Sequence, residues 1–182
     1  RDQYGDLGLP GQQNRNSPEQ LASPTDVVQA AVGEGHMLLL GRDGTAWVTG
    51  NNGYGALGLG DTTNRHSPEQ LASPTALAQV AAGGYHSLLL GADGAAWGMG
   101  TNGYGALGLD DTTSRSTPAQ LSSPTNVIQI AASGEHSVFL DGDGRVWATG
   151  YNAYGQLGLG DTTNRLSAER LSPTNVAHVA AG

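Results

Sequence analysis

The chain has 182 residues, enough for one compact domain, and its 29 glycines, 8 prolines and 13% charged residues favour an all-β fold over long helices. The formal net charge is −8 and lysine is absent, which argues against binding to a nucleic-acid backbone or to anionic lipid. The lack of cysteine removes disulfides and thiolate metal sites, and no apolar run is long enough to span a membrane.

A repeat of 50 residues organises the whole sequence. Its markers are the tryptophans Trp47, Trp97 and Trp147, the histidines His36, His86 and His136, and Tyr-Gly pairs that start at Tyr4, Tyr54, Tyr104 and Tyr154. Such a period indicates supersecondary units that bury their apolar faces against one another. Residues 1–182 are therefore expected to form a single repeat domain.

In chain order, the sequence opens at a Tyr-Gly loop, and a short segment follows near Glu19 to Leu21. Three complete units come next, each with an apolar segment, a second segment after a Gly-His or Gly-x-His step, an Ala-Trp or Val-Trp segment, and a short fourth segment. One first-type segment, residues 176–181, closes the chain. Four short segments per unit predict a β-propeller of four-stranded antiparallel blades, as an incomplete ring of three full blades plus two partial ones.

Turn signals fix the order of strands within a unit. The pairs Asp43-Gly44, Asp93-Gly94 and Asp143-Gly144 lie between two apolar runs and predict hairpins between the second and third strands. Small residues crowd 81–84 and 131–134, which is expected where strands converge near a narrow axis. The first strand of each unit is therefore predicted to be innermost.

Three strings in the middle of the chain resemble the regulator of chromosome condensation repeat family. They are Gly84-Tyr85-His86-Ser87-Leu88-Leu89-Leu90, Asp93-Gly94-Ala95-Ala96-Trp97-Gly98-Met99-Gly100 and Asn102-Gly103-Tyr104-Gly105-Ala106-Leu107-Gly108-Leu109. The resemblance implies a β-propeller, which in this family has seven blades. It also implies a scaffold whose functions vary among members, one of them being nucleotide exchange on the GTPase Ran. This chain lacks the exchange factor's basic tail and an inserted wedge loop.

The repeated aromatic and imidazole side chains are interpreted as structural. Each histidine is expected to hydrogen-bond backbone at the end of an inner strand and so to order a blade junction. A pH-linked role stays open if the histidines converge near the axis. Each tryptophan is expected to be buried between blades as a packing residue.

No cofactor, metal or catalytic residue is predicted. Asp141 and Asp143 alternate as in a calcium loop, but further ligands are missing and a hairpin turn explains them. In the loop that begins at Asp61, Asp and Thr are expected to cap their own backbone while Arg65 bridges to a neighbouring blade. The alternative is a repeated polar rim that contacts a partner.

Positions that differ between repeats are the candidates for a partner surface: Glu34, Tyr85, Glu135 and Tyr151. The predicted function is a non-enzymatic protein-interaction scaffold, part of a larger exported bacterial protein at the cell surface or outside the cell, with the cytoplasm left open. A guanine-nucleotide exchange module and a self-associating surface or filament protein are the alternatives. The partner would be a protein, with self-association through open blade edges and no nucleic acid.

Overall fold

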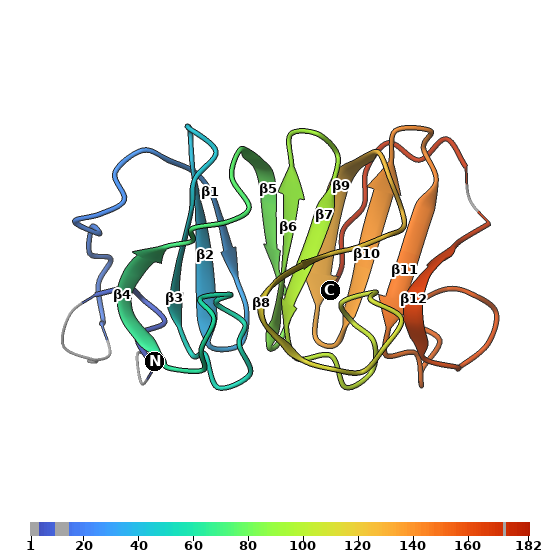
Figure 1. The fold of residues 1–182 in the computed structure, drawn as a ribbon, viewed down its shortest axis with the longest axis horizontal. Helices are drawn as coiled ribbons and strands as arrows, with labels where there is room; N and C mark the ends of the chain where they lie inside the picture. Colours follow the sequence, from blue (N-terminus) through green and yellow to red (C-terminus); the bar gives the residue numbers. More distant parts are fainter. Residues whose placement is uncertain (1–3, 10–14, 173) are drawn as a thin grey trace.

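The computed structural model describes residues 4–9, 15–172 and 174–182, and these residues form three four-stranded antiparallel sheets without a helix (Figure 1). They include no helix long and apolar enough to cross a membrane. The sheets stand side by side, each built from strands consecutive in sequence. The prediction of four-stranded propeller blades in an incomplete ring is confirmed.

The strand bounds follow the 50-residue period. The first sheet contains β1 (Val27–Val32), β2 (His36–Gly41), β3 (Ala46–Gly50) and β4 (Arg65–Gln70). The second contains β5 (Leu77–Ala82), β6 (His86–Gly91), β7 (Ala96–Gly100) and β8 (Arg115–Gln120). The third contains β9 (Val127–Ser133), β10 (His136–Asp141), β11 (Val146–Gly150) and β12 (Arg165–Arg170).

The predicted hairpins connect the second and third strands of every sheet. Gly44, Gly94 and Gly144 have φ angles of 80°, 80° and 73°, a left-handed conformation that a Cβ would disfavour. The register is the same in the three hairpins, with Leu39 opposite Trp47, Leu89 opposite Trp97 and Phe139 opposite Trp147. Each Asp-Gly pair therefore sets the register of its sheet.

The first strands β1, β5 and β9 lie beside one another, as predicted for innermost strands. The Gln29 side chain bonds both backbone groups of Val80, donating to its carbonyl at 2.9 Å and accepting from its N–H at 3.1 Å. Gln79 does the same with Ile130. Gln129 repeats the pattern on Val179, which places 174–182 beside β9 in the position of a further first strand.

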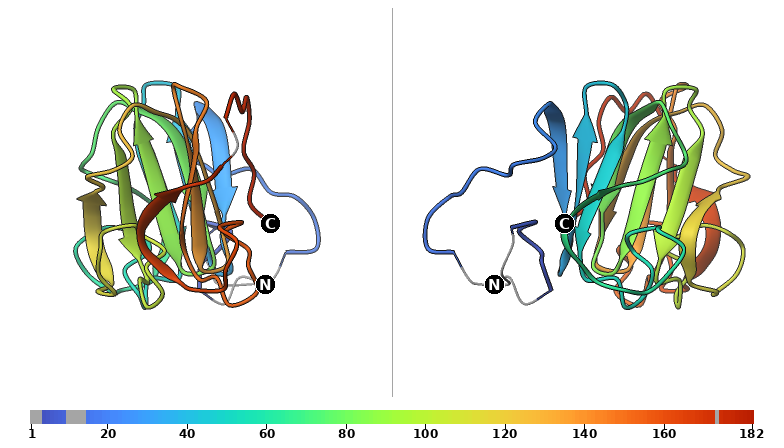
Figure 2. Two further views of the ribbon diagram at one scale, coloured as in Figure 1. Left: turned by 90° about the vertical axis from the view of Figure 1, so that its right-hand side faces the viewer. Right: turned by 60° about the vertical axis from the view of Figure 1, so that its left-hand side comes forward.

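The N-terminal residues have a repeat-like place as well. Thr49 donates its hydroxyl hydrogen to the carbonyl of Gly5 at 2.9 Å, as Thr149 does to Gly105 at 2.8 Å. Residues 4–9 therefore contact the first sheet as the loop after β7 contacts the third. The segment that leads into β1 arches away from the sheets (Figure 2).

Apolar side chains fill the spaces between adjacent sheets. One cluster joins the first and second sheets through residues such as Leu38, Val48 and Leu89, and another joins the second and third through Leu88 and Phe139. These five side chains are fully buried, so packing between blades supplies the core.

The tryptophans are less buried than predicted. Trp97 and Trp147 pack against the two inter-sheet clusters, but all three tryptophans stay partly exposed. The reason is visible at Trp97, which lines a groove of about 400 Å³ together with Leu71, Pro74 and Pro118. Solvent reaches the ring through this groove, so Trp97 packs between blades without being fully buried.

Candidate protein-binding face

The candidate site lies at the end of the sheets where the first strand of each finishes and the fourth begins. We call this the loop end. It carries three turns, 33–35, 83–85 and 134–135, and three long loops, 51–64, 101–114 and 151–164. The hairpins after β2, β6 and β10 lie at the other end, called the hairpin end. Antiparallel order places turns and loops of all three repeats at the same end (Figure 1).

A buried asparagine holds each long loop from inside. Asn52 accepts a hydrogen bond from the Leu57 N–H at 2.9 Å and donates to the Asp61 carbonyl at 3.0 Å. Asn102 and Asn152 make the equivalent bonds, and all three are fully buried. Because a buried amide forms these bonds at both of its polar atoms, the loops have defined conformations.

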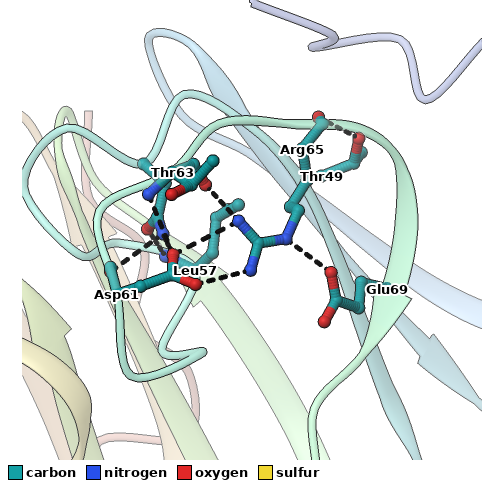
Figure 3. A network of polar contacts seen from close by, with 7 residues as sticks. Thr49, Leu57, Asp61, Thr63, Arg65 and Glu69 are labelled. Carbon is teal, nitrogen blue, oxygen red and sulfur yellow. Dashed lines mark hydrogen bonds and ion pairs between the residues drawn. The ribbon is translucent and has the colours of Figure 1, made fainter.

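An aspartate and an arginine brace the outside of each loop. Asp61 accepts from the Thr63 N–H at 2.8 Å and pairs with Arg65 at 2.8 Å, and Arg65 also pairs with Glu69 (Figure 3). The hydrogen bond from Arg65 lowers the pKa of Asp61, with smaller help from the Thr63 N–H. The predicted backbone capping by aspartate is confirmed.

The predicted bridge from Arg65 to a neighbouring blade is wrong, because its bonds stay within its own repeat. Arg115 and Arg165 pair with Asp111 and Asp161 in the same way, each at 2.6 Å. Each guanidinium bonds the aspartate four residues before it in the chain, so it is engaged within its own repeat. Each loop arginine is therefore neutralised locally.

Histidines join adjacent blades beneath these loops. His36 Nε2 lies 2.9 Å from the Ser87 hydroxyl, which donates to the Ala56 carbonyl at 2.8 Å. His86, Ser137 and Ala106 form the second junction. Since the serine hydrogen is used on the carbonyl, the ring nitrogen is the donor and the serine oxygen accepts.

His36 and His86 lie at blade junctions, and the side-chain partner of each is a serine of the next repeat. Burial lowers the pKa of His36 to about 4 and that of His86 to about 3. His136 is only partly buried, and burial lowers its pKa as well. Both buried rings are therefore neutral at physiological pH.

Glycine makes room for the two buried rings. A Cβ added at Gly33 or Gly83 would collide with the imidazole of His36 or His86. The third repeat has Ser133 at this position, and its His136 is the one that is not fully buried. His36 and His86 are also covered by a serine of the following sheet, whereas no fourth sheet follows His136 in the described part of the chain.

Five tyrosines of the described sheets gather on the loop end, four of them exposed and Tyr151 partly exposed. Tyr54 is 54% exposed and lies 5.3 Å, between ring centroids, from Tyr85 of the next sheet. Tyr151 lies 4.8 Å from Tyr104 and 6.0 Å from Tyr154, which is 86% exposed. We call these five residues, with Glu34 and Glu135, the tyrosine face.

The structure brings the four predicted surface residues together as two pairs. Tyr85 donates a hydrogen bond to Glu34, which raises the pKa of the Tyr85 phenol. Burial, followed by the neighbouring Tyr154 and Tyr104, raises the pKa of Tyr151, and the charge of Glu135 adds to the shift. Glu34 and Glu135 are both exposed.

Sequence reasoning missed Tyr54, Tyr104 and Tyr154 because the Tyr-Gly pair served only as a repeat marker. The available signal was the local sequence. A tyrosine between Gly53 and Gly55 lies in a glycine-rich turn, where side chains commonly face solvent. Tyr54, Tyr104 and Tyr154 do face solvent, although Asn52 and Leu57 of the first loop are buried.

The alternating aspartates at the other end serve the hairpin. Asp141 accepts from the N–H groups of Asp143 and Arg145 at 3.0 and 2.9 Å and from the indole of Trp147 at 2.9 Å. Burial alone would raise the pKa of Asp141, but these hydrogen bonds lower it. Within the described residues, no group of three or more histidine, cysteine or acidic side chains is arranged to hold a metal ion.

The fold and its repeated junctions are those of a β-propeller built from tandem repeats. Models of the Regulator of chromosome condensation (RCC1) repeat match residues 1–40, 43–90, 93–140 and 143–182, and a second model of the repeat matches 27–56, 77–106 and 127–156. The chain belongs to this family. No curated protein sequence matches it.

Solved structures of longer propellers are similar to the chain. Prp20p from Saccharomyces cerevisiae superposes with a TM-score of 0.83 at 23% identity, over 95% of this chain and 45% of that one. Human WBSCR16 superposes with a TM-score of 0.76 at 29% sequence identity, over 86% of this chain and 42% of that one. Yeast RCC1 (Prp20), in the structure of its complex with Kap60, superposes with a TM-score of 0.83 at 23% sequence identity, over 95% of this chain and 43% of that one. The chain therefore spans less than half the length of these proteins.

Proposed function

We propose that the chain is a non-enzymatic protein-interaction scaffold whose partner contacts the tyrosine face. The observation that carries the proposal is the gathering of exposed tyrosines from three repeats at one end of the sheets. Tyrosine supplies a large contact area at little cost in side-chain entropy and is enriched at the centres of protein interfaces. The buried asparagines and ion pairs fix the loops, so a partner meets a preorganised surface.

The similar propellers support a role in protein binding. The structure of Prp20p was described with its binding to Gsp1p and histones, and yeast RCC1 was solved bound to Kap60. These partners belong to those proteins, which are more than twice as long as this chain. What supports the proposal here is the shared propeller scaffold, with a surface of this chain's own.

The polar groups of the loops support a structural and not a catalytic use. Asp61 and Arg65 bond each other, and the same arrangement recurs in the other two repeats. A catalytic triad needs a nucleophile, a base and an orienting group assembled once in one place. The aspartate–arginine pair occurs in all three repeats and its groups bond each other, so it braces the loops.

A capture experiment with matched variants tests the proposal. The immobilised wild-type chain, a Tyr54→Ala/Tyr104→Ala/Tyr154→Ala variant and an Asp93→Asn variant at the hairpin end would be exposed to extract of the native source. We expect one protein in stoichiometric amount on the wild type and on Asp93→Asn, and its loss on the tyrosine variant. Equal capture by all three, or no stoichiometric partner, would contradict the proposal.

The two alternative functions make different predictions. An exchange module would accelerate nucleotide release from a small GTPase, and a self-associating structural protein would show a molar mass that rises with concentration in light scattering. Absence of nucleic-acid binding, a bacterial source and a location outside the cell stay predictions, the first from the net charge of −8 and the others from composition.

A further inference from the structure

We infer that the tyrosine face binds an extended, arginine-bearing segment of the partner protein, with one guanidinium at each of two tyrosine–glutamate clusters. The inference rests on the proposed function and specifies the chemistry that the face recognises. The first cluster contains Glu34, Tyr54 and Tyr85. The second contains Tyr104, Glu135, Tyr151 and Tyr154.

Both clusters have the components of a cation site. In the first, the carboxylate of Glu34 accepts from the Tyr85 hydroxyl, and the Tyr85 and Tyr54 rings meet at 58°. In the second, the Tyr151 N–H donates to the Glu135 carbonyl at 2.9 Å, and the Tyr151 ring meets Tyr104 at 59° and Tyr154 at 73°. Tilted rings beside a carboxylate offer a cation an electron-rich ring face and a counter-charge together.

The charge of the surroundings favours a positive partner. Arg65, Arg115 and Arg165 begin β4, β8 and β12 at this end, and aspartates of the preceding loops pair with all three. Their side chains are only 18%, 27% and 14% exposed. Glu34 and Glu135 are exposed, and within the described chain neither is paired with an arginine. The face therefore presents uncompensated negative charge.

The geometry favours arginine over lysine. A planar guanidinium can stack on a tyrosine ring while its N–H groups reach a carboxylate, whereas an ammonium is a compact and strongly hydrated charge. Each cluster is also open on its outer side, since Tyr54 is 54% and Tyr154 is 86% exposed. Stacking is therefore expected to contribute to selectivity in addition to charge.

The placement of the clusters favours an extended segment. The first joins the first and second sheets, and the second joins the second and third, so they occupy successive blade junctions. Between them the turns are linked by backbone bonds, Glu34 N–H to the Gly84 carbonyl at 3.2 Å and Gly84 N–H to the Gly134 carbonyl at 2.8 Å. A chain that crosses this linked rim can place one side chain in each cluster, which gives bivalent binding.

Fluorescence anisotropy with defined peptides tests the inference. The probe is a labelled 12-residue peptide of glycine, serine and four evenly spaced arginines, and matched peptides replace arginine by lysine or by the neutral isostere citrulline. We expect saturable binding of the arginine peptide, affinity about threefold to tenfold lower for lysine, and no binding of the citrulline peptide. Equal affinity for the arginine and citrulline peptides would overturn the inference.

Variants locate the binding. Tyr154→Ala and Glu135→Gln in the second cluster, and Tyr54→Ala and Glu34→Gln in the first, are each expected to weaken peptide binding about fivefold to tenfold, and one change in each cluster together to abolish it. These side chains are exposed, so the fold is expected to persist, and circular dichroism checks this. Asp93→Asn at the hairpin end changes the charge by the same amount and is expected to stay within about twofold of wild type. Equal losses for Asp93→Asn and Glu135→Gln would show a general charge effect and contradict the inference.

The capture experiment separates the inference from the proposed function. If a partner is lost from the tyrosine variant but arginine peptides neither bind nor compete with it, the scaffold function stands and the arginine chemistry is wrong. If arginine peptides bind the clusters but no partner depends on the tyrosine face, the cation sites exist and the scaffold function is wrong. Competition of the arginine peptide with the captured partner supports both.

Discussion

The neutral histidines between blades predict that mild acid destabilises the protein. The ordinary pKa of histidine is 6.5, while burial lowers the pKa of His36 to about 4 and that of His86 to about 3 in the folded chain. At pH values between 6.5 and the lowered pKa of each histidine, the unfolded chain binds more protons than the folded chain does. The free energy of unfolding therefore falls as pH falls below about 6.5 and continues to fall until the folded pKa is reached.

The expected magnitude follows from the linkage relation. Each histidine contributes a slope of about 1.4 kcal/mol per pH unit inside this window. From about pH 7 to about pH 5, the loss is roughly 2 kcal/mol for each buried histidine and roughly 4 kcal/mol for both. Partly buried His136 acts in the same direction. The loop aspartates have lowered pKa values, so the stability they add is lost below their ordinary value of 3.8, which lies under the range from pH 7 to pH 5.

Urea unfolding at several pH values, followed by tryptophan fluorescence, measures this loss. His86→Gln supplies the control, because an amide can still donate to Ser137 but does not titrate. We expect the variant to lose about 2 kcal/mol less than wild type between pH 7 and pH 5. A wild-type stability that is flat across this range, or an unchanged slope in His86→Gln, would refute the reasoning.

Four further predictions concern packing, loop order and the turn. Trp97→Ala should lower the free energy of unfolding by about 2 to 4 kcal/mol, and Trp47→Ala by less because no inter-sheet cluster includes Trp47; equal losses would contradict this. Asn102→Ala should cost about 2 to 3 kcal/mol by leaving the Leu107 N–H and the Asp111 carbonyl unpaired, as denaturant unfolding would show. Gly83→Ala should displace the His86 ring and move its pKa towards 6.5 in an NMR titration, since the added Cβ collides with the imidazole; an unchanged pKa would argue against this steric role. Calorimetric titration with calcium should be flat, because the Asp141 oxygens already accept three hydrogen bonds; an isotherm lost in Asp141→Ala would reverse this.

The fold was predictable because its determinants are local and repeated. The 50-residue period gave the number of complete blades, and the Asp-Gly pairs gave the hairpins whose glycines have positive φ. The small residues near 81–84 and 131–134 identified the inner strands. Each of these signals lies within a few residues of the feature it determines, so one sequence was sufficient.

The partners of individual side chains were not predictable, because contacts between blades join residues about 51 positions apart. Nothing in the sequence states that His36 meets Ser87 of the next repeat. Arg65 was assigned to a neighbouring blade for the same reason, although a carboxylate four residues away in its own loop was closer. The burial of Trp97 depends on how widely adjacent sheets separate, which the period does not specify.

The sequence predicted only some of the residues of the candidate site. Differences between repeats identified Glu34, Tyr85, Glu135 and Tyr151, and the structure groups them in two pairs on one face. The tyrosines that complete the face were overlooked because they recur without change. In a repeat protein, a residue can be identical in every unit and still be exposed, and only its surroundings show whether it serves the core or a partner.

Site-specific photo-crosslinking can show directly whether the partner contacts the tyrosine face. A photoreactive phenylalanine analogue in place of Tyr154, which is 86% exposed on the tyrosine face, would be compared with the same analogue in place of Asp93 at the hairpin end. In extract of the native source, the account predicts a discrete adduct of defined mass from position 154, suppressed by excess arginine peptide, and none from position 93. Adducts from position 93 alone, or equally from both positions, would contradict it.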